Sequence, residues 1–186
     1  MWIYEFDFGV LDFIRENIVC PPLDAVMKIF TYGGSGGAVW IAVSLCMMFS
    51  RSKELRTTGI IMAAMLVMTL LFDNILLKNL IARPRPFVQR PDIILSISPP
   101  GGYSFPSGHS CSSFGGAAVI GMRVKKRAVR AAVWAAAALI AFSRLYFYVH
   151  FPTDVIAGAV LGCVLGIACV WAGEKISVSI DRRSDS

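Results

Sequence analysis

The sequence predicts an all-α membrane protein, a polytopic helical bundle of about five transmembrane helices preceded by N-terminal interfacial helices. Hydrophobic residues make up 56% of its 186 residues and charged residues only 16%, whereas a soluble domain carries about 25% charged residues. The apolar residues also gather in runs close to the roughly 20 residues that a helix needs to span a bilayer. We therefore expect much of the surface to face lipid.

The N-terminal segment, residues 1–32, mixes large apolar side chains with acidic and basic ones. Such a segment is too polar to span a membrane and suits an amphipathic helix that lies in the interface. Pro21 and Pro22 end this helix, and a second short helix is expected over residues 23–30. Because no basic n-region precedes an apolar run, no secretory signal peptide is predicted.

Five apolar runs follow and form the expected transmembrane bundle, residues 33–173. The first and third runs are short, so their spans must borrow flanking residues. The runs cover residues 34–49, 57–81, 109–122, 128–148 and 153–173. The remaining residues, 174–186, are expected to form a cytoplasmic tail.

A glycine-rich cluster, residues 33–37, opens the first run. It lacks the Gly-Lys-Ser/Thr ending of a phosphate-binding loop. We therefore interpret it as a flexible joint or a close contact between helices.

Eleven of the 18 lysines and arginines lie in three short segments, residues 51–56, 123–130 and 175–183. If the five spans alternate, all three segments lie on one side of the membrane. The positive-inside rule places that side, with the C-terminus, in the cytoplasm and the N-terminus outside. Because the net charge of +6 arises largely from these segments, it does not indicate a nucleic-acid partner. The loop of residues 83–106 then lies on the outer face.

Both histidines lie where an outer loop meets a predicted span. His109 follows Ser107 and Gly108 at the start of the third run, and His150 stands four residues before Asp154 at the start of the fifth. Asp154 is about one helical turn from His150, close enough to accept a hydrogen bond from Nδ1–H and leave Nε2 as a nucleophile. His109 is then left to give a proton to a departing oxygen.

Three cationic side chains, Lys78, Arg85 and Arg144, are expected at the same depth as the histidines. Guanidinium groups match phosphate oxygens with paired hydrogen bonds, so the three cations predict an anion site. Free backbone N–H groups at the helix start after Ser107 would point at the same anion. Simpler interpretations exist, since Lys78 can snorkel and Ser107 can act only as a helix cap. The convergence of these groups on one face favours the anion site.

Three motifs carry a resemblance to a known family. They are Lys78, six residues and Arg85-Pro86; Pro-Ser-Gly-His at 106–109; and Ser143-Arg144, five residues, His150, three residues and Asp154. Their order and spacing resemble the type 2 phosphatidic-acid phosphatase superfamily, whose fold is shared with vanadium haloperoxidases. The match covers nearly half of the chain. Larger relatives have six full spans, whereas interfacial helices replace the first span here.

The resemblance implies a metal-independent phosphatase without a cofactor that forms a phosphohistidine intermediate. It implies that His150 attacks phosphorus, Asp154 orients His150 and His109 protonates the leaving group. The residues that would hold the phosphoryl oxygens are Lys78, Arg85, Ser107, Gly108 and Arg144. The expected substrate is a lipid phosphate or diphosphate, with undecaprenyl diphosphate preferred over phosphatidic acid and phosphatidylglycerophosphate. Hydrolysis is expected at the extracytoplasmic face of a bacterial inner membrane.

Two other functions stay open at this point. A protein that binds or transports lipid headgroups needs the cations but has no use for a histidine paired with a carboxylate. A haloperoxidase needs vanadate, and the five predicted spans disfavour the soluble form that this class takes. Arg83 lies outside the motifs and is expected to contact the loop or a headgroup. Asp73 and Asn74, within the second run, are expected to support their neighbours rather than to catalyse.

Overall fold

The computed structural model describes residues 2–184, so residues 185 and 186 of the predicted tail lie outside it. Within the described residues every regular element is a helix, which confirms the all-α prediction. The elements in chain order are α1 (Trp2–Asn17), α2 (Pro21–Gly33), η1 (Ser35–Gly37), α3 (Ala38–Met48), α4 (Lys53–Thr69), η2 (Leu70–Leu77), α5 (Lys78–Ile81), α6 (Pro86–Gln89), α7 (Gly108–Arg123), α8 (Arg127–Tyr146) and α9 (Pro152–Ser184). Of these, η1 is a 3-10 turn and η2 is a π-helix.

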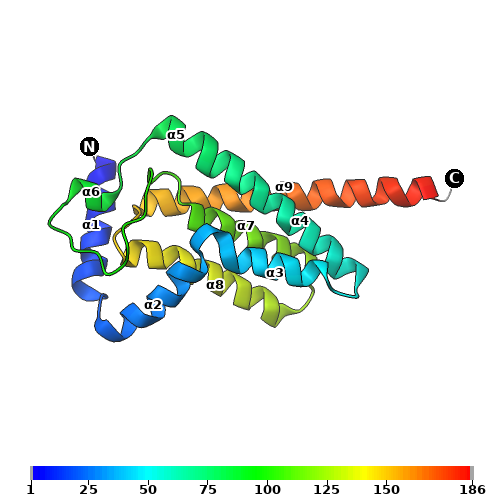
Figure 1. Ribbon diagram of the computed structural model, residues 1–186, viewed down its shortest axis with the longest axis horizontal. Coiled ribbons are helices and arrows are strands. Elements are labelled where there is room, and N and C mark those ends of the chain that lie inside the picture. Colours follow the sequence, from blue (N-terminus) through cyan, green and yellow to red (C-terminus); the bar gives the residue numbers. More distant parts are fainter. Residues whose placement is uncertain (1, 185–186) are drawn as a thin grey trace.

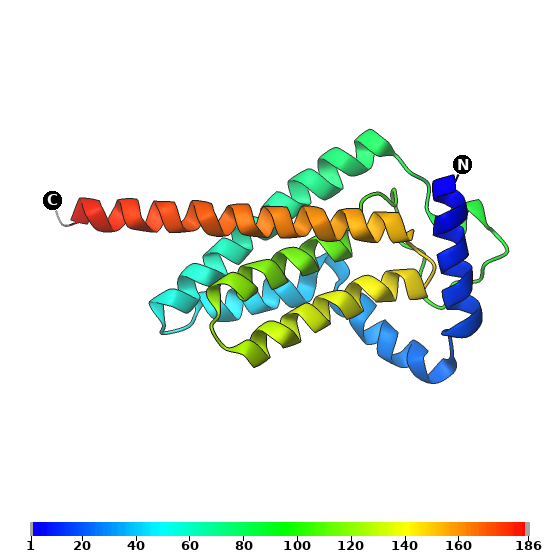
Figure 2. The same ribbon diagram turned by 180° about the vertical axis from the view of Figure 1, so that it is seen from behind.

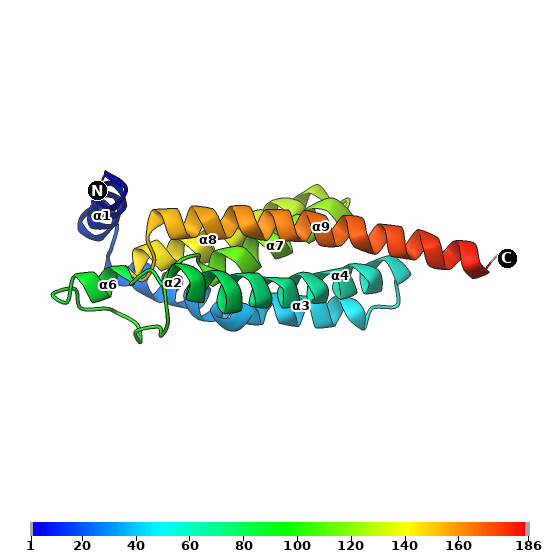
Figure 3. The same ribbon diagram turned by 90° about the horizontal axis from the view of Figure 1, so that it is seen from above.

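Helices α3, α4, α7, α8 and α9 run side by side as a bundle (Figure 1). The central helix, α7, packs most extensively against α9 and α8. Helix α1 lies across one end of this bundle (Figure 2). At the opposite end α9 continues beyond its neighbours (Figure 3), because no proline or glycine interrupts the chain between Gly173 and Ser184. The predicted tail therefore continues the last helix through Ser184.

In the described part of the chain, three segments are long and apolar enough to cross a membrane, namely Lys53–Gln89, Arg127–Tyr146 and Pro152–Ile176. A fourth span results if α2 and the following Ser35–Met48 are taken together across their 52° bend. The polytopic bundle is thus confirmed. The short helix expected over residues 23–30 belongs to α2 and is joined to α3.

The bend between α2 and α3 comes from the glycine cluster. Gly36 and Gly37 have φ angles of 59° and 73°, in the left-handed region that favours glycine. A Cβ on Gly34 would lie 2.8 Å from Cδ2 of His109, so this position also needs glycine for a close contact. The cluster is therefore a bend and a close helix contact, as its sequence predicted.

Helix α7 coincides with the span predicted over residues 109–122, but it is shorter than a helix that crosses a bilayer. Its 16 residues rise about 24 Å, and most of them are buried inside the bundle. Small residues allow this burial: a Cβ on Gly166 of α9 would lie only 2.7 Å from the Gly115 carbonyl oxygen. Because neighbouring helices surround α7, its length is not set by the thickness of the lipid.

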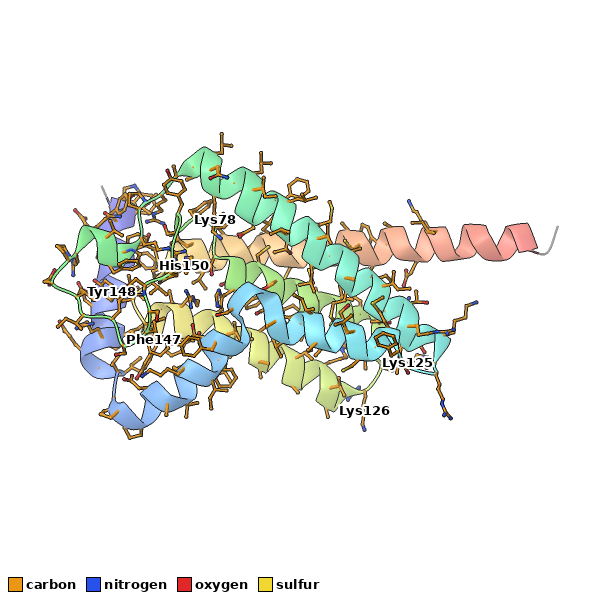
Figure 4. The ribbon with its side chains drawn as sticks, viewed as in Figure 1. Lys78, Lys125, Lys126, Phe147, Tyr148 and His150 are labelled. Carbon is orange, nitrogen blue, oxygen red and sulfur yellow. The ribbon has the colours of Figure 1, made fainter. Side chains whose placement is uncertain are left out.

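The two ends of the bundle differ in charge. Lys125 and Lys126, in the turn between α7 and α8, lie at the opposite end from Lys78 and His150 (Figure 4). The turn between α3 and α4 and the C-terminal end of α9 also lie at the lysine-bearing end (Figure 1). The three basic segments identified in the sequence therefore share one end of the molecule.

Candidate active site

His150 lies in the short connection between α8 and α9, immediately before Pro152 begins α9. Its side chain is buried. The Nη1 of Arg85 lies 3.0 Å from Nε2 of His150. Because a guanidinium can only donate hydrogen bonds, Nε2 must be the accepting nitrogen, and the proton of the neutral ring is on Nδ1.

The surroundings of His150 keep its ring neutral. Burial, followed by the positive charges of Arg85, Arg144 and Lys78, lowers the pKa of His150 well below the ordinary value of 6.5. At neutral pH the ring therefore offers an unprotonated Nε2, which is the form that a nucleophile needs.

Asp154 lies in the first turn of α9 and is fully buried. Its Oδ2 is 3.6 Å from Nδ1 of His150, which is longer than a hydrogen bond. The same oxygen accepts a hydrogen bond from the Phe151 N–H at 2.9 Å, while Oδ1 accepts one from Nη1 of Arg83 at 2.6 Å. The carboxylate thus stands beside Nδ1, although the direct bond expected from the sequence is not formed.

Arg85 and Arg144 are 6% and 4% exposed. Arg85 donates to backbone carbonyls, including that of Val149 at 3.0 Å, and Arg144 donates to the hydroxyl of Thr31. Neither guanidinium forms an ion pair with a carboxylate in the described part of the chain. A buried charge is stable only when it is compensated, so the two arginines are suited to hold an anion.

Lys78 opens α5, directly after the π-helix η2. Its Nζ lies 3.0 Å from Oδ2 of the buried Asp73. Asp73 therefore supports Lys78, in agreement with the role expected for it. The wider turn of a π-helix is common at functional sites, and here it immediately precedes the cationic residue.

His109 lies in the first turn of α7, one residue after Gly108. Its Nε2 is 3.0 Å from the Thr31 carbonyl oxygen, and its Cδ2 faces Gly34. One edge of the ring thus faces α2 and the bend after it, so Nδ1 is on the other edge. The Ser107 side chain caps α7 by accepting a hydrogen bond from the Ser110 N–H at 3.4 Å, the simpler role considered for it.

A cavity of about 530 Å³ joins these groups to an apolar groove. Its polar end is lined by Lys78, Arg85, Gly108, His109, Arg144 and His150. Its apolar part runs between α3 and α4 and is lined by Ile41, Leu45, Met48, Leu66, Val67 and Leu70. The other two residues expected at the site, Ser107 and Asp154, are not among its lining residues and stand next to Gly108 and His150.

The side-chain contacts of three residues in this region, Thr31, Arg83 and Asp7, were not predicted. Thr31 accepts from Arg144 through its hydroxyl and contacts His109 through its carbonyl oxygen. Arg83 was expected to contact the loop or a headgroup, and its carbonyl oxygen does accept a hydrogen bond from Ser104 of the loop. The contacts of its guanidinium were not foreseen: it donates to Asp154 and, through Nη2, to Asp7 of α1 at 2.6 Å. No spacing in the sequence could reveal these pairs, because each joins residues more than 70 positions apart.

Comparisons with known proteins show which proteins the chain is similar to. The chain is 33% identical to an undecaprenyl-diphosphatase of Sulfolobus acidocaldarius, over 84% of this chain and 73% of that protein. It is 29% identical to a lipid A 4′-phosphatase of Porphyromonas gingivalis, over 83% and 68%. The crystal structure of Aquifex aeolicus LpxE aligns with a TM-score of 0.72 and 29% identity, over 89% of this chain and 94% of LpxE.

A second solved structure supports the fold alone, because its identity is only 24%. It is a transmembrane PAP2 type phosphatidylglycerolphosphate phosphatase from Bacillus subtilis, with a TM-score of 0.71 over 94% of this chain and 88% of that one. The PAP2 superfamily profile matches residues 57–177, a range that contains every residue expected at the site. The chain is therefore an integral membrane protein that belongs to the PAP2 superfamily of lipid phosphatases.

Proposed function

We propose that this chain removes phosphate from a membrane lipid through a phosphohistidine formed on His150, at the extracytoplasmic face. The observation that carries the proposal is a cavity that joins two buried guanidiniums, neither in an ion pair with any described carboxylate, to an apolar groove. A phosphate supplies the negative charge that the arginines need, and a hydrocarbon tail fits the groove. A ligand with both parts is a lipid phosphate.

The proposed reaction has two steps. In the first, Nε2 of His150 attacks phosphorus, a P–N bond forms, and the bond from phosphorus to the lipid oxygen breaks. His109 gives a proton to that oxygen as the imidazolium, the form that the negative charge of the bound phosphate favours. Its Nε2 donates to the Thr31 carbonyl oxygen, so Nδ1 carries the proton that is transferred. Asp154 stabilises the positive charge that develops on the His150 ring.

In the second step water attacks phosphorus and the P–N bond breaks. His109, which lost its proton in the first step, accepts one from the attacking water. Arg85, Arg144 and Lys78, with the N–H groups at the start of α7, hold the phosphoryl oxygens in both steps. Inorganic phosphate is then released and His150 is regenerated.

The groove supports a lipid whose tail lies along α3. The 11 residues of α3 rise about 16 Å, which is enough for the first part of a long chain. We propose undecaprenyl diphosphate as the substrate, and similarity to an undecaprenyl-diphosphatase supports this choice. The second candidate is the phosphate of lipid A, supported by relatives that are lipid A 4′-phosphatases.

Phosphate release by the purified protein, with EDTA present, tests the proposal. The panel is undecaprenyl diphosphate, a lipid A phosphate, phosphatidic acid and phosphatidylglycerophosphate, with His150→Ala as the inactive control. We expect turnover that is greatest with undecaprenyl diphosphate. Binding of these lipids without release of phosphate would identify a headgroup-binding protein instead. Activity that EDTA abolishes and Mg²⁺ restores would contradict the metal-independent mechanism.

A further inference from the structure

The guanidinium of Arg83 lies between two carboxylates from opposite ends of the sequence. Its Nη1 donates to Oδ1 of Asp154 at 2.6 Å, and its Nη2 donates to Oδ2 of Asp7 at 2.6 Å. Both carboxylates are fully buried. Arg83 therefore joins α1, which carries Asp7, to the first turn of α9, which carries Asp154.

Asp7 also holds the start of α9 directly. Its Oδ1 accepts a hydrogen bond from the Thr153 N–H at 3.0 Å, and its Oδ2 accepts one from the Thr153 hydroxyl at 2.6 Å. The first N–H groups of a helix have no partner within the helix, and a carboxylate at this end also interacts favourably with the helix dipole. Asp7 thus supplies from α1 a cap that α9 does not supply itself.

The position of Arg83 is fixed on all sides. The Cζ of Arg83 lies 4.0 Å from the ring centroid of Phe151 and 4.8 Å from that of Tyr4. The buried Ser104 donates its N–H to the Arg83 carbonyl oxygen at 2.9 Å. The guanidinium therefore has one orientation, and the direction of the Asp154 carboxylate is determined by it.

We infer that Arg83 and Asp7 are positioning residues that orient Asp154 toward His150, so that α1 is a working part of the active site. This inference rests on the proposed function, in which Asp154 acts on Nδ1 of His150. One guanidinium between two carboxylates leaves one negative charge unbalanced. That charge faces the His150 ring, which becomes positive when Nε2 binds phosphorus.

Arginine is required at this position because its planar fork reaches both carboxylates at once, which a lysine ammonium cannot reproduce. Without the Arg83 guanidinium, the Asp154 carboxylate would lose the hydrogen bond to Oδ1 and keep the one that the Phe151 N–H donates to Oδ2. The carboxylate would then turn away from Nδ1 of His150. A small misplacement of a catalytic group can lower the rate about 10²-fold. The phosphate ligands Arg85 and Arg144 do not contact Arg83, so binding of the phosphate should be unaffected.

A second α1 carboxylate provides a matched control. Asp12 accepts hydrogen bonds from Arg90 at 2.7 Å and from the Tyr148 hydroxyl at 2.7 Å. This cluster also holds α1 against the loops of the same end, but among the described residues none of its hydrogen bonds reaches Asp154. Asp12→Asn therefore weakens the docking of α1 without disturbing the orientation of Asp154.

The experiment measures kcat and KM for Arg83→Gln, Asp7→Asn and Asp12→Asn. We expect Arg83→Gln to lower kcat roughly 10²-fold with KM unchanged, Asp7→Asn to lower it less, and Asp12→Asn to keep the wild-type kcat. In the double variant Arg83→Gln/Asp154→Asn the loss should equal that of Asp154→Asn alone, because residues that act as a unit are not additive.

Losses that multiply in the double variant, or an unchanged kcat in Arg83→Gln, would overturn the inference. If Arg83→Gln fails to fold, Arg83→Lys replaces it, since this variant keeps the positive charge but lacks the planar guanidinium. A wild-type kcat in Arg83→Lys would also overturn the inference. Wild-type protein that releases no phosphate would instead contradict the proposed function. The two failures are therefore distinguishable.

Discussion

At the scale of single residues, the two histidines differ in what holds them. Arg85 and the neighbouring Asp154 leave Nε2 of His150 as the lone-pair nitrogen. His109 is held instead by a backbone carbonyl, and within the described residues its ring forms no ion pair with a carboxylate. This difference supports our proposal that His150 is the nucleophile and that His109 transfers the proton.

Substitution of the histidines tests this assignment. His150→Ala should abolish the phosphoenzyme, because no other nitrogen receives phosphorus. His109→Ala should lower turnover most with poor leaving groups, since general acid catalysis contributes about 10²–10⁴-fold. The measurement is labelling of the protein by a radioactive lipid phosphate, and the label of a phosphohistidine survives alkali and is lost in acid. A normal phosphoenzyme level in His150→Ala would show that another residue is the nucleophile.

Gly34 offers a test of the position of His109. A Cβ at Gly34 would meet Cδ2 of His109 at 2.8 Å and Cγ2 of Ile140 at 2.6 Å. Gly34→Ala should therefore displace the His109 ring and lower kcat roughly tenfold or more. The neighbouring Gly33→Ala is the control, because nothing lies within 4 Å of its Cβ. Equal activity of the two alanine variants would mean that the ring tolerates the shift.

At the scale of elements, the groove between α3 and α4 separates tail recognition from chemistry. Ala63 lines this groove, whereas Ile60 on the same helix is exposed on the lipid-facing surface. Each methylene kept out of apolar contact costs about 0.8 kcal/mol. The groove should therefore discriminate between lipids by the part of the tail that it encloses.

Ala63→Trp should lower kcat/KM for a long-chain lipid phosphate roughly tenfold, the effect of excluding about two methylenes. Hydrolysis of a short water-soluble phosphate ester should remain at the wild-type rate, because the phosphate ligands are untouched. Ile60→Trp, with its side chain in lipid, should change neither rate. Loss of activity toward both substrates in Ala63→Trp would point to a damaged catalytic end rather than to a blocked groove.

Much of this architecture could be predicted from the sequence, since hydropathy identifies apolar runs and motif spacing identifies the histidines and cations. The burial of α7 and the union of α2 with α3 could not, because both depend on glycine contacts between distant helices. The contacts of Thr31 and Arg83 could not be predicted either, because their partners are distant in the sequence. Thr31 lies 113 residues from Arg144, and a neutral threonine in an apolar stretch carries no local sign of its partner.

At the scale of the whole molecule, the two ends carry different tasks. One end holds the site and the α1 cap, and the other holds the basic segments (Figure 4). Short basic loops set the orientation of a membrane protein, so the catalytic end should face away from the cytoplasm. The substrate should then be a lipid of the outer leaflet.

Cysteine labelling tests this orientation. In a variant without the native cysteines, Ser98→Cys places an exposed thiol in the loop at the catalytic end, and Ser52→Cys places one between α3 and α4. A membrane-impermeant maleimide should label Ser98→Cys in intact cells and Ser52→Cys only after the membrane is opened. The reverse pattern would contradict both the orientation and the preference for an outer-leaflet lipid.

The enclosure of α7 has a consequence for biogenesis. Its polar groups find partners on other helices: Ser113 accepts from Trp40 of α3 at 2.9 Å, and Cys111 lies 3.7 Å from the Thr69 hydroxyl of α4. Alone, a 16-residue segment rich in serine and glycine is too short and too polar for the translocon to release into lipid. During synthesis we therefore expect α7 to enter the membrane only after α8 and α9 have been made, together with those two helices. A nascent chain that ends after Arg127 should leave residues 109–123 accessible to aqueous labelling, and one that extends through Ile176 should protect them.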